Sequence, residues 1–338
     1  MREANVLFIW NVPEPLREYI RSGLVDFDSV NLFFPQDATE EGFLLLASDM
    51  DIIIGWRPSR NLLDTAKRLK LFINPGVGVQ HLIDLFREIN QRREVTLING
   101  HGNTYFTAQH AVAMLLALTN KIIPHHNWMM HGLWRRGDSD AKSTPLRDLK
   151  VGLLGYGAVN QKVHRFLSGF DIEFNILKRS WSEHPDFPTS AKKFLPDNLH
   201  KFITESDILI VAVPQTDETS SMIGKEELLL LASNGIIVNV ARGAVIDEEA
   251  LYQALAENQL AGAAIDVWYE YNPEPDTTGK KYPFHFPFHE LDNVVLSPHR
   301  GASPMDDLMR WDEVIENIRR FAEGKDEFIN VVQLDRGY

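Results

Sequence analysis

The stretch VGLLGYGAVN, residues 151–160, has the pattern of a β-strand that enters a helix through a glycine-rich turn. Gly155 permits a tight turn, and Gly157 allows the backbone to approach a pyrophosphate at the helix N-terminus. The third small residue of this pattern is replaced by Asn160, whose side chain should push the helix outward or point its amide at the ligand. The turn predicts a dinucleotide site, and a glycine-rich turn without a nucleotide is the alternative. The site would also include Tyr156, Ala158 and Val159.

Short β-rich runs alternate with helical spacing on both sides of this turn, which is typical of parallel sheets with helices on both faces. The sequence therefore predicts an α/β fold with two Rossmann-like or flavodoxin-like doubly wound parallel-sheet domains and a cleft between them. The first strand-to-helix turn of the chain contains no glycine, so the N-terminal half should bind nucleotides poorly. The expected strands are 4–10, 30–35, 51–56, 70–75, 95–100, 151–155, 172–178, 207–214, 235–241, 262–268 and 294–299; the expected helices are 16–23, 62–69, 81–90, 106–132 interrupted at Pro124, 158–170, 248–258 and 304–323.

The composition limits the classes of protein that this chain can represent. With 338 residues and a net charge of −13, two domains are expected, and a basic face for nucleic acid is disfavoured. The absence of cysteine excludes disulfides, thiol nucleophiles and thiolate metal sites. The N-terminal apolar run is too short for a signal peptide or a membrane span, so we expect a soluble cytoplasmic protein. The histidines of 125–131 and the pair His285 and His289 are interpreted as packing or interface residues, and no metal site is expected.

Two cations follow the strand after the glycine-rich turn. A ribose-binding carboxylate is normally found at this distance from the glycines, but the sequence has Lys178 and Arg179. Cations cannot accept a hydrogen bond from a ribose 2′-hydroxyl, whereas they pair well with a 2′-phosphate. The pair therefore favours NADP over NAD as the cofactor, with NAD still possible; the alternative is that both are solvated surface charges.

Three polar residues follow three later strands. Arg242 lies in NVARGAVID, Asp266 in AAIDVW and His299 in SPHRGAS. Ligands of open α/β sheets bind outside the carboxyl ends of the strands, so the three side chains are expected to share one site.

At this point the chain resembles the D-isomer-specific 2-hydroxyacid dehydrogenase family, in particular its glyoxylate and hydroxypyruvate reductases. The resemblance implies a substrate-binding domain of residues 1–105 plus 298–338 and a dinucleotide-binding Rossmann domain of residues 106–297. It also implies a homodimer through the cofactor domain, with HGLW (131–134) near the contact. The motifs that carry it are NPGVGVQHLID (74–84), AQHAVAMLLAL (108–118), VGLLGYGAVN (151–160), VAVPQTDETSSMIG (211–224), NVARGAVIDEEAL (239–251), AAIDVW (263–268) and SPHRGAS (297–303).

The resemblance further implies the roles of individual residues in the NAD(P)H-dependent reduction of a small 2-oxo acid to a D-2-hydroxy acid. His299 would be the general acid and base, and Arg242 would bind the substrate carboxylate and polarise the carbonyl. Asp266 would hold the nicotinamide carboxamide. The backbone N–H groups of Val77 and Gly78 would bind the far side of the carboxylate, Arg57 would border the pocket, and Val213, Pro214 and Ala241 would border the cofactor.

One position departs from the family pattern. The family has a glutamate five residues after the Asp266 equivalent, where it raises the pKa of the histidine. Tyr271 stands there, and Glu270 and Glu274 lie on either side. Either a shifted loop brings Glu270 to the catalytic position, or Tyr271 occupies it. The departure keeps two other functions open: a formate-dehydrogenase-like activity, and a nucleotide-sensing corepressor that only binds. The long segment 272–290 either covers the cleft or decorates the surface.

Overall fold

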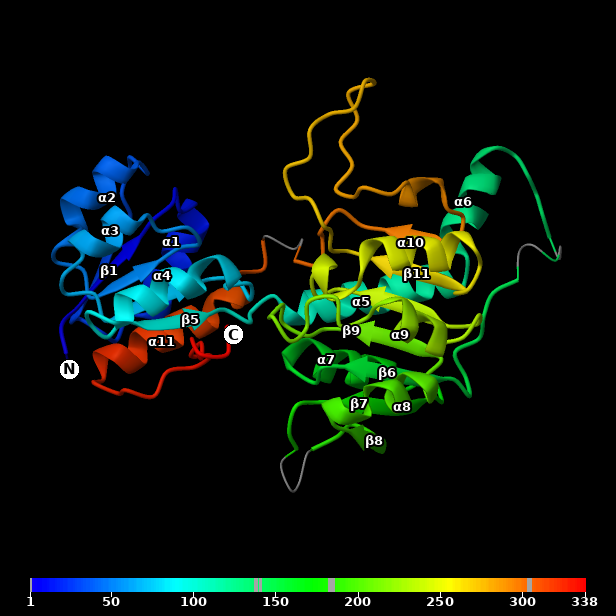
Figure 1. Ribbon diagram of the computed structural model, residues 1–338. Helices are drawn as coiled ribbons and strands as arrows, with labels where there is room; N and C mark the ends of the chain where they lie inside the picture. The colour runs from blue at the N-terminus through cyan, green and yellow to red at the C-terminus, as the bar shows by residue number, and fades with distance from the viewer. Residues whose placement is uncertain (1, 137–138, 140–141, 182–185, 303–305) are drawn as a thin grey trace. The chain divides into compact units, whose positions relative to one another are not determined.

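The computed structural model describes residues 2–136, 139, 142–181, 186–302 and 306–338. The chain divides into two compact units, residues 1–103 together with 304–338, and residues 104–303. The sequence GDSDAKSTP (137–145) predicts a loop, part of which lies outside the described residues, as does the start of the helix expected over 304–323. The predicted pair of doubly wound α/β domains is confirmed, because each unit is a parallel sheet with helices on both faces (Figure 1). The cleft expected between them stays a prediction.

The first unit contains a five-stranded sheet in the order β2-β1-β3-β4-β5, and all its pairs are parallel. This is the flavodoxin-like order. Helix α2 of this unit is not among the expected helices, because its run of leucines has no helical period. Thr39 caps α2 by accepting a hydrogen bond from Gly42 N at 3.2 Å. The strands are β1 Ala4–Phe8, β2 Val30–Phe33, β3 Ile52–Ile54, β4 Leu71–Asn74 and β5 Thr96–Asn99; the helices are α1 Glu14–Gly23, α2 Glu40–Ala47, α3 Arg60–Thr65, α4 Gln80–Asn90 and α11 Asp312–Ala322.

The C-terminal helix α11 belongs to this first unit. Side chains alternate between the two faces of a strand, so Leu7 of β1 joins the core under α2, α3 and α4. Val6 and Phe8 join the core of the opposite face, where α11 contributes Ile315 and Ile318. The predicted amphipathic tail helix is thus confirmed, although the regular α-helix begins only at Asp312, after a 3₁₀ turn.

The second unit contains a seven-stranded parallel sheet in the order β12-β11-β10-β9-β6-β7-β8, which is the Rossmann order extended by one strand. Strand β8 was not predicted, because its sequence AKKF is short and charged, as suits an edge strand. The strands are β6 Lys150–Leu154, β7 Glu173–Leu177, β8 Ala191–Phe194, β9 Ile208–Val211, β10 Ile236–Asn239, β11 Gly262–Ile265 and β12 Val294–Leu296; the helices are α5 Thr104–Thr119, α6 Ile122–Met130, α7 Ala158–Leu167, α8 Leu199–Thr204, α9 Lys225–Leu230 and α10 Glu248–Ala256.

The long helix expected over 106–132 is two helices, and the predicted interruption at Pro124 is wrong. The break lies at Lys121, which has a left-handed φ of 53° between α5 and α6. Pro124 sits in the first turn of α6, where a missing N–H costs no intrahelical hydrogen bond.

The long connection between β11 and β12 is held by side chains that fold back onto α10. Its only regular element is a 3₁₀ turn at Phe288–Glu290. Tyr269 donates its hydroxyl to Ile246 O at 3.1 Å, and His285 Nδ1 lies 2.7 Å from Glu248 Oε2. Phe288 is fully buried, and Phe284 and Phe286 pack partly buried against the same core. The phenylalanines of this segment therefore serve to attach it to its own unit.

Candidate active site

The glycine-rich turn lies at the point where the strand order of the second unit reverses, between β6 and β9. Gly155 has a φ of +81°, and a Cβ atom there would lie 2.7 Å from Val213 Cγ1 and 2.8 Å from Ala212 O. Only glycine therefore permits both the backbone conformation and the close approach of the β9 end. Gly157 is the N-cap of α7, and nothing lies within 4 Å of a Cβ built on it. The turn thus leaves open space before the N-terminus of α7, as a pyrophosphate site requires.

Asn160 holds this turn from inside. Its side chain is fully buried, and its Nδ2 donates to Gly155 O at 2.7 Å and lies 3.2 Å from Leu154 O and 3.3 Å from Ile210 O. The expectation that its amide points at a ligand is therefore wrong. A glycine at this position would let the helix pack closely on the strand. The Asn160 amide instead links α7 to the turn and to β9 by hydrogen bonds.

Tyr156 also points into the protein. Its hydroxyl lies 2.8 Å from His164 Nδ1, and His164 Nε2 lies 2.9 Å from Thr189 Oγ1. Burial lowers the pKa of His164 to about 4 and raises that of Tyr156 to about 12, so both are neutral near pH 7. Of Tyr156, only the backbone is therefore available to a nucleotide at this turn; the neighbouring Ala158 and Val159 are partly buried in the first turn of α7.

Lys178 and Arg179 follow β7, the strand next to the glycine-rich strand. Lys178 Nζ lies 6.0 Å from the centre of the Trp181 ring. The Arg179 guanidinium forms an ion pair with Glu218, from the segment after β9, and both side chains are largely exposed. A 2′-phosphate at this position would therefore compete with a carboxylate for Arg179.

Arg242 lies beyond the end of β10, and the neighbouring backbone is tightly held. The buried Asn239 side chain donates to Arg242 O at 3.1 Å and accepts from Ala241 N at 3.1 Å. A Cβ atom on Gly243 would lie 2.4 Å from Trp268 O, so the bare glycine lets this loop approach the segment after β11. Burial lowers the pKa of Arg242, and the Tyr271 phenol opposes that shift.

His299 lies in a turn of residues 297–301, which we call the histidine turn. Its φ of 54° is left-handed, a conformation that costs a non-glycine residue roughly 1–3 kcal/mol. The buried Asp266 carboxylate accepts hydrogen bonds from Arg300 N at 2.7 Å and from Gly301 N at 2.9 Å. Asp266 thus stabilises the strained turn; the role in holding a nicotinamide stays a prediction.

Tyr271, and not Glu270, lies beside His299. The centres of the Tyr271 and His299 rings are 5.3 Å apart, and the Tyr271 hydroxyl accepts from Trp268 N at 3.4 Å. The Glu270 carboxylate instead accepts a hydrogen bond from Asn272 N at 2.7 Å. Of the two arrangements that the sequence leaves open, the geometry favours the one without a carboxylate at the histidine, so we do not assign a catalytic role to Glu270.

The electrostatics of the three side chains follow from this arrangement. His299 keeps solvent access on part of its ring, but the surrounding protein desolvates it and lowers its pKa below the ordinary value. The Asp266 carboxylate opposes this shift of the His299 pKa, and the Arg242 guanidinium adds to it. Burial opposes the ionisation of Asp266, but hydrogen bonds from His110, Ser297 and two backbone groups hold its pKa below the ordinary value.

The substrate-binding residues predicted in the first unit lie on two loops, which follow the adjacent strands β3 and β4. Arg57 and the side chain of Val77 are exposed, and Gly78 is partly buried. Two asparagines that the sequence analysis missed hold the second loop by its carbonyl oxygens. Asn74 Nδ2 donates to Gly76 O at 2.5 Å, and Asn99 Nδ2 donates to Val77 O at 2.9 Å. Substrate binding by these loops stays a prediction.

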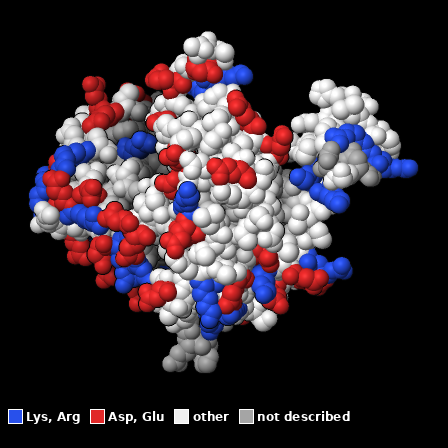
Figure 2. All heavy atoms as spheres, turned by 45° about the vertical axis from the view of Figure 1, so that its right-hand side comes forward, with Lys and Arg blue, Asp and Glu red and all other residues white. Residues whose placement is uncertain are grey.

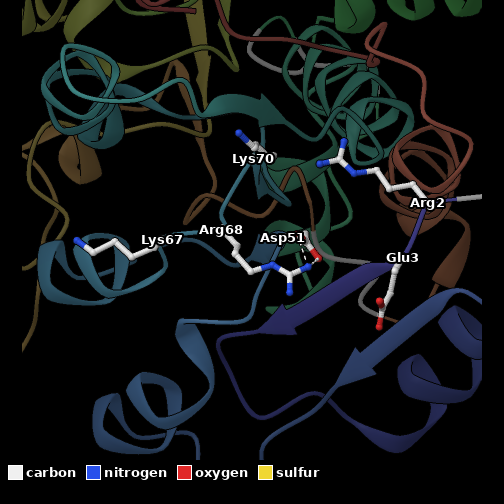
Figure 3. Close-up of a pocket in the computed structure, with 6 residues that line it drawn as sticks. All are labelled: Arg2, Glu3, Asp51, Lys67, Arg68 and Lys70. Atoms are coloured by element: carbon white, nitrogen blue, oxygen red, sulfur yellow. Dashed lines mark hydrogen bonds and ion pairs between the residues drawn. The ribbon is translucent and has the colours of Figure 1, made fainter.

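A separate pocket of about 550 Å³ in the first unit lies at the opposite, amino ends of β1, β3 and β4 (Figure 3). Figure 3 shows Arg68 turned toward the buried Asp51, whose carboxylate lies 3.2 Å from Arg68 Nη2 and also accepts from Asn5 N at 3.0 Å. These bonds hold strand ends together, so we interpret the pocket as structural.

Three histidines outside the site, His200, His285 and His289, pair with or stack on another side chain. His289 stacks on Tyr282 with ring centres 4.1 Å apart, and His285 pairs with Glu248. His200 forms a cluster with Glu226 and Glu227 that the sequence analysis missed. Glu227 Oε2 accepts from Gly224 N at 3.0 Å, so this cluster caps helix α9.

The fold and the turn define the class: a Rossmann-type protein with a glycine-rich dinucleotide site, an arginine beyond β10 and a histidine beyond β12. The model of the NAD binding domain of D-isomer specific 2-hydroxyacid dehydrogenases matches residues 112–301. The chain belongs to the D-isomer specific 2-hydroxyacid dehydrogenase family, whose members are nicotinamide-dependent oxidoreductases.

Named relatives support this assignment. Glyoxylate reductase of Pyrococcus furiosus is 30% identical over 303 residues, which cover 86% of this chain and 84% of that protein. D-3-phosphoglycerate dehydrogenase of Archaeoglobus fulgidus is 32% identical over 78% of this chain, but the match spans only 47% of that longer protein. The fold matches a D-isomer specific 2-hydroxyacid dehydrogenase from Xanthobacter autotrophicus, solved with NADPH and MES, with a TM-score of 0.77, 24% identity and coverage of 100% of both chains. Among the described residues, no helix has the length and apolar character to cross a membrane.

Proposed function

We propose that the protein reduces a small 2-oxo acid, of the glyoxylate or hydroxypyruvate type, to a D-2-hydroxy acid with NADPH. The observation that carries the proposal is the placement of Arg242 and His299 beyond the carboxyl ends of β10 and β12, in the sheet that holds the dinucleotide turn. Relatives named glyoxylate reductase, such as that of Pyrococcus furiosus, support a small 2-oxo acid as the substrate.

The chain offers the features that a nicotinamide dinucleotide needs. Gly155 keeps the turn tight, and Gly157 leaves the space before α7 open. When bound, the reduced nicotinamide supplies a hydride to the carbonyl carbon of the substrate. Arg242 binds the substrate carboxylate with its planar guanidinium and stabilises negative charge that develops on the carbonyl oxygen. His299 donates a proton to that oxygen, and it accepts the proton when a hydroxy acid is oxidised.

The preference for NADPH rests on Lys178 and Arg179. Both follow β7, where NAD-binding proteins carry an acidic residue, and both would pair with a 2′-phosphate. Arg179 pairs with the exposed Glu218, and a 2′-phosphate would replace that carboxylate as the partner of its guanidinium.

We expect the purified protein to oxidise NADPH in the presence of glyoxylate or hydroxypyruvate, followed by absorbance at 340 nm. In the variant Lys178→Asp with Arg179→Ser, the 2′-phosphate loses two charge-assisted partners, each worth about 1.5–3 kcal/mol. The KM for NADPH should therefore rise at least about tenfold while that for NADH stays nearly constant.

An equal loss for both nucleotides would contradict the role of this pair, and Lys192→Asp with Lys201→Ser is the matched surface control. If the protein bound the nucleotide but turned over no 2-oxo acid, its function would be binding and the proposed enzymatic activity would be wrong. Oxidation of formate without reduction of 2-oxo acids would favour the formate-dehydrogenase alternative.

We further propose that the protein is a homodimer through α6 and the segment that follows it. Met130 and Trp134 there are 71% and 72% exposed. Residues 104–136 contain Lys121, Arg135 and Arg136 and no acidic residue, in a chain of net charge −13. Figure 2 shows basic side chains on the lobe that projects at the right of the view, and acidic side chains interspersed with basic ones on the surface beside it. The exposed apolar and basic surface of α6 and residues 131–136 is best complemented by a second copy of this acidic chain.

Light scattering should give twice the chain mass of 38.6 kDa for the wild type. The variant Met130→Ser with Trp134→Ser should give one chain mass, because the exposed apolar area that drives association is lost. Leu45→Ser, which removes an even more exposed apolar side chain from the first unit, should remain a dimer. A monomeric wild type would contradict the proposal.

A further inference from the structure

The histidine turn is anchored by a side chain to which the mechanism gives no role. His110 lies on α5, and its Nε2 is 2.9 Å from Ser297 Oγ and 3.3 Å from Asp266 Oδ1. We propose that His110 is a positioning residue, which fixes Ser297 and Asp266 and thereby the backbone that presents His299. This inference rests on the proposed function, because it assumes that His299 transfers the proton.

The chemistry of the partners determines which atoms donate. An ionised carboxylate only accepts hydrogen bonds, so the hydroxyl of Ser297 must donate to Asp266 Oδ1, from which it is 2.5 Å away. The Ser297 oxygen can then accept from His110. His110 Nε2 therefore carries a proton and points it at Ser297 Oγ and Asp266 Oδ1 together.

Asp266 transmits this anchoring to the backbone of the histidine turn. Its two oxygens accept from Arg300 N and Gly301 N, the two residues directly after His299. Gly301 is required for this contact, because a Cβ there would lie 2.9 Å from Asp266 Oδ2. The left-handed φ of His299 persists only if the surrounding structure holds it, and these bonds provide that support.

Helix α5 holds the turn at both ends. Thr107, three residues before His110 and so on the same helix face, donates its hydroxyl to Gly301 O at 3.2 Å. Ser297, at the other end of the turn, is the partner of His110. The turn therefore takes its position from α5, and His110 is the anchor whose bond leads directly to the Asp266 carboxylate.

The variant His110→Phe keeps an aromatic ring on α5 but removes the donor. We expect kcat for the reduction to fall about 10- to 100-fold, since displacement of a reacting group by about 1 Å has effects of this size. His110→Gln places an amide N–H at a similar reach and should restore kcat to within about threefold of the wild type.

Two further measurements separate a positioning role from a general loss of stability. The double variant His110→Phe with Ser297→Ala should lose no more than the worse single variant, since both remove the same interaction. Thermal unfolding should show that His110→Phe is folded at the assay temperature. Wild-type kcat in His110→Phe, kcat in His110→Gln as low as in His110→Phe, or additive losses would each overturn the proposal. If His299→Asn retained full activity, the proposed function itself would fail, whatever His110 does.

Discussion

Replacement of His299 by asparagine is expected to lower kcat for 2-oxo acid reduction by about 10²–10⁴-fold, the usual contribution of a general acid. Asparagine retains the polarity and can adopt the left-handed backbone conformation of this position, but it cannot supply a proton. Steady-state assays at 340 nm with saturating NADPH measure the effect. His200→Asn, an exposed histidine paired with Glu227, is the matched control and should leave kcat unchanged. Loss of less than about threefold in His299→Asn would remove the histidine from the mechanism.

The pH dependence of the wild type tests the same residue. Burial lowers the pKa of His299 below the ordinary value of 6.5. The general acid must be protonated for reduction, so kcat/KM for the oxo acid should fall as pH rises through a midpoint below 6.5. Oxidation of the hydroxy acid needs the neutral imidazole of His299. Its kcat/KM should therefore rise as pH rises through the same midpoint. His299→Asn should show neither.

The variant Tyr271→Glu tests the effect of placing a carboxylate beside His299. A negative charge next to His299 favours the protonated imidazole, so the midpoint of kcat/KM should move to higher pH by about one unit. An unchanged midpoint would mean that the side chain at position 271 does not face the imidazole as the 5.3 Å ring separation indicates.

Replacement of Arg242 by glutamine is the second large effect that we expect, with kcat/KM lowered about 10²–10³-fold. Glutamine can donate hydrogen bonds but lacks the charge and the fork that match a carboxylate. Arg242→Lys keeps the charge and should recover part of the loss. If the guanidinium acts on the reacting carbonyl as well as on the carboxylate, both kcat and KM change.

A change in KM alone would restrict Arg242 to substrate binding. The exposed Arg92, which pairs with Asp64 and Glu88 in the first unit, offers the control Arg92→Gln. That variant should behave like the wild type in both kcat and KM.

Most of the fold was predictable because its signals are local and repeated. Strand–helix alternation with apolar strands identified both sheets, and the glycines of 151–160 identified which unit binds the nucleotide. Predicted strands commonly ran too far at their carboxyl ends, for example through Pro214 and His299, because the loop residues of the site continue the apolar or extended pattern. Helices α2, α8 and α9 and strand β8 have no counterpart among the expected elements. Neither α2 nor β8 shows a regular period of apolar residues.

The sequence by itself determined that Arg242, Asp266 and His299 lie at one edge of a sheet, because parallel strands place their carboxyl ends together. Tertiary structure alone decided the inner arrangement: Tyr271 beside His299, Asn160 turned inward, and His110 reaching Ser297 from a helix more than 180 residues away in the chain. The physical reason is that loop backbones and hydrogen bonds between distant elements follow no sequence period. Their positions depend on how separate elements pack, which only the folded chain specifies.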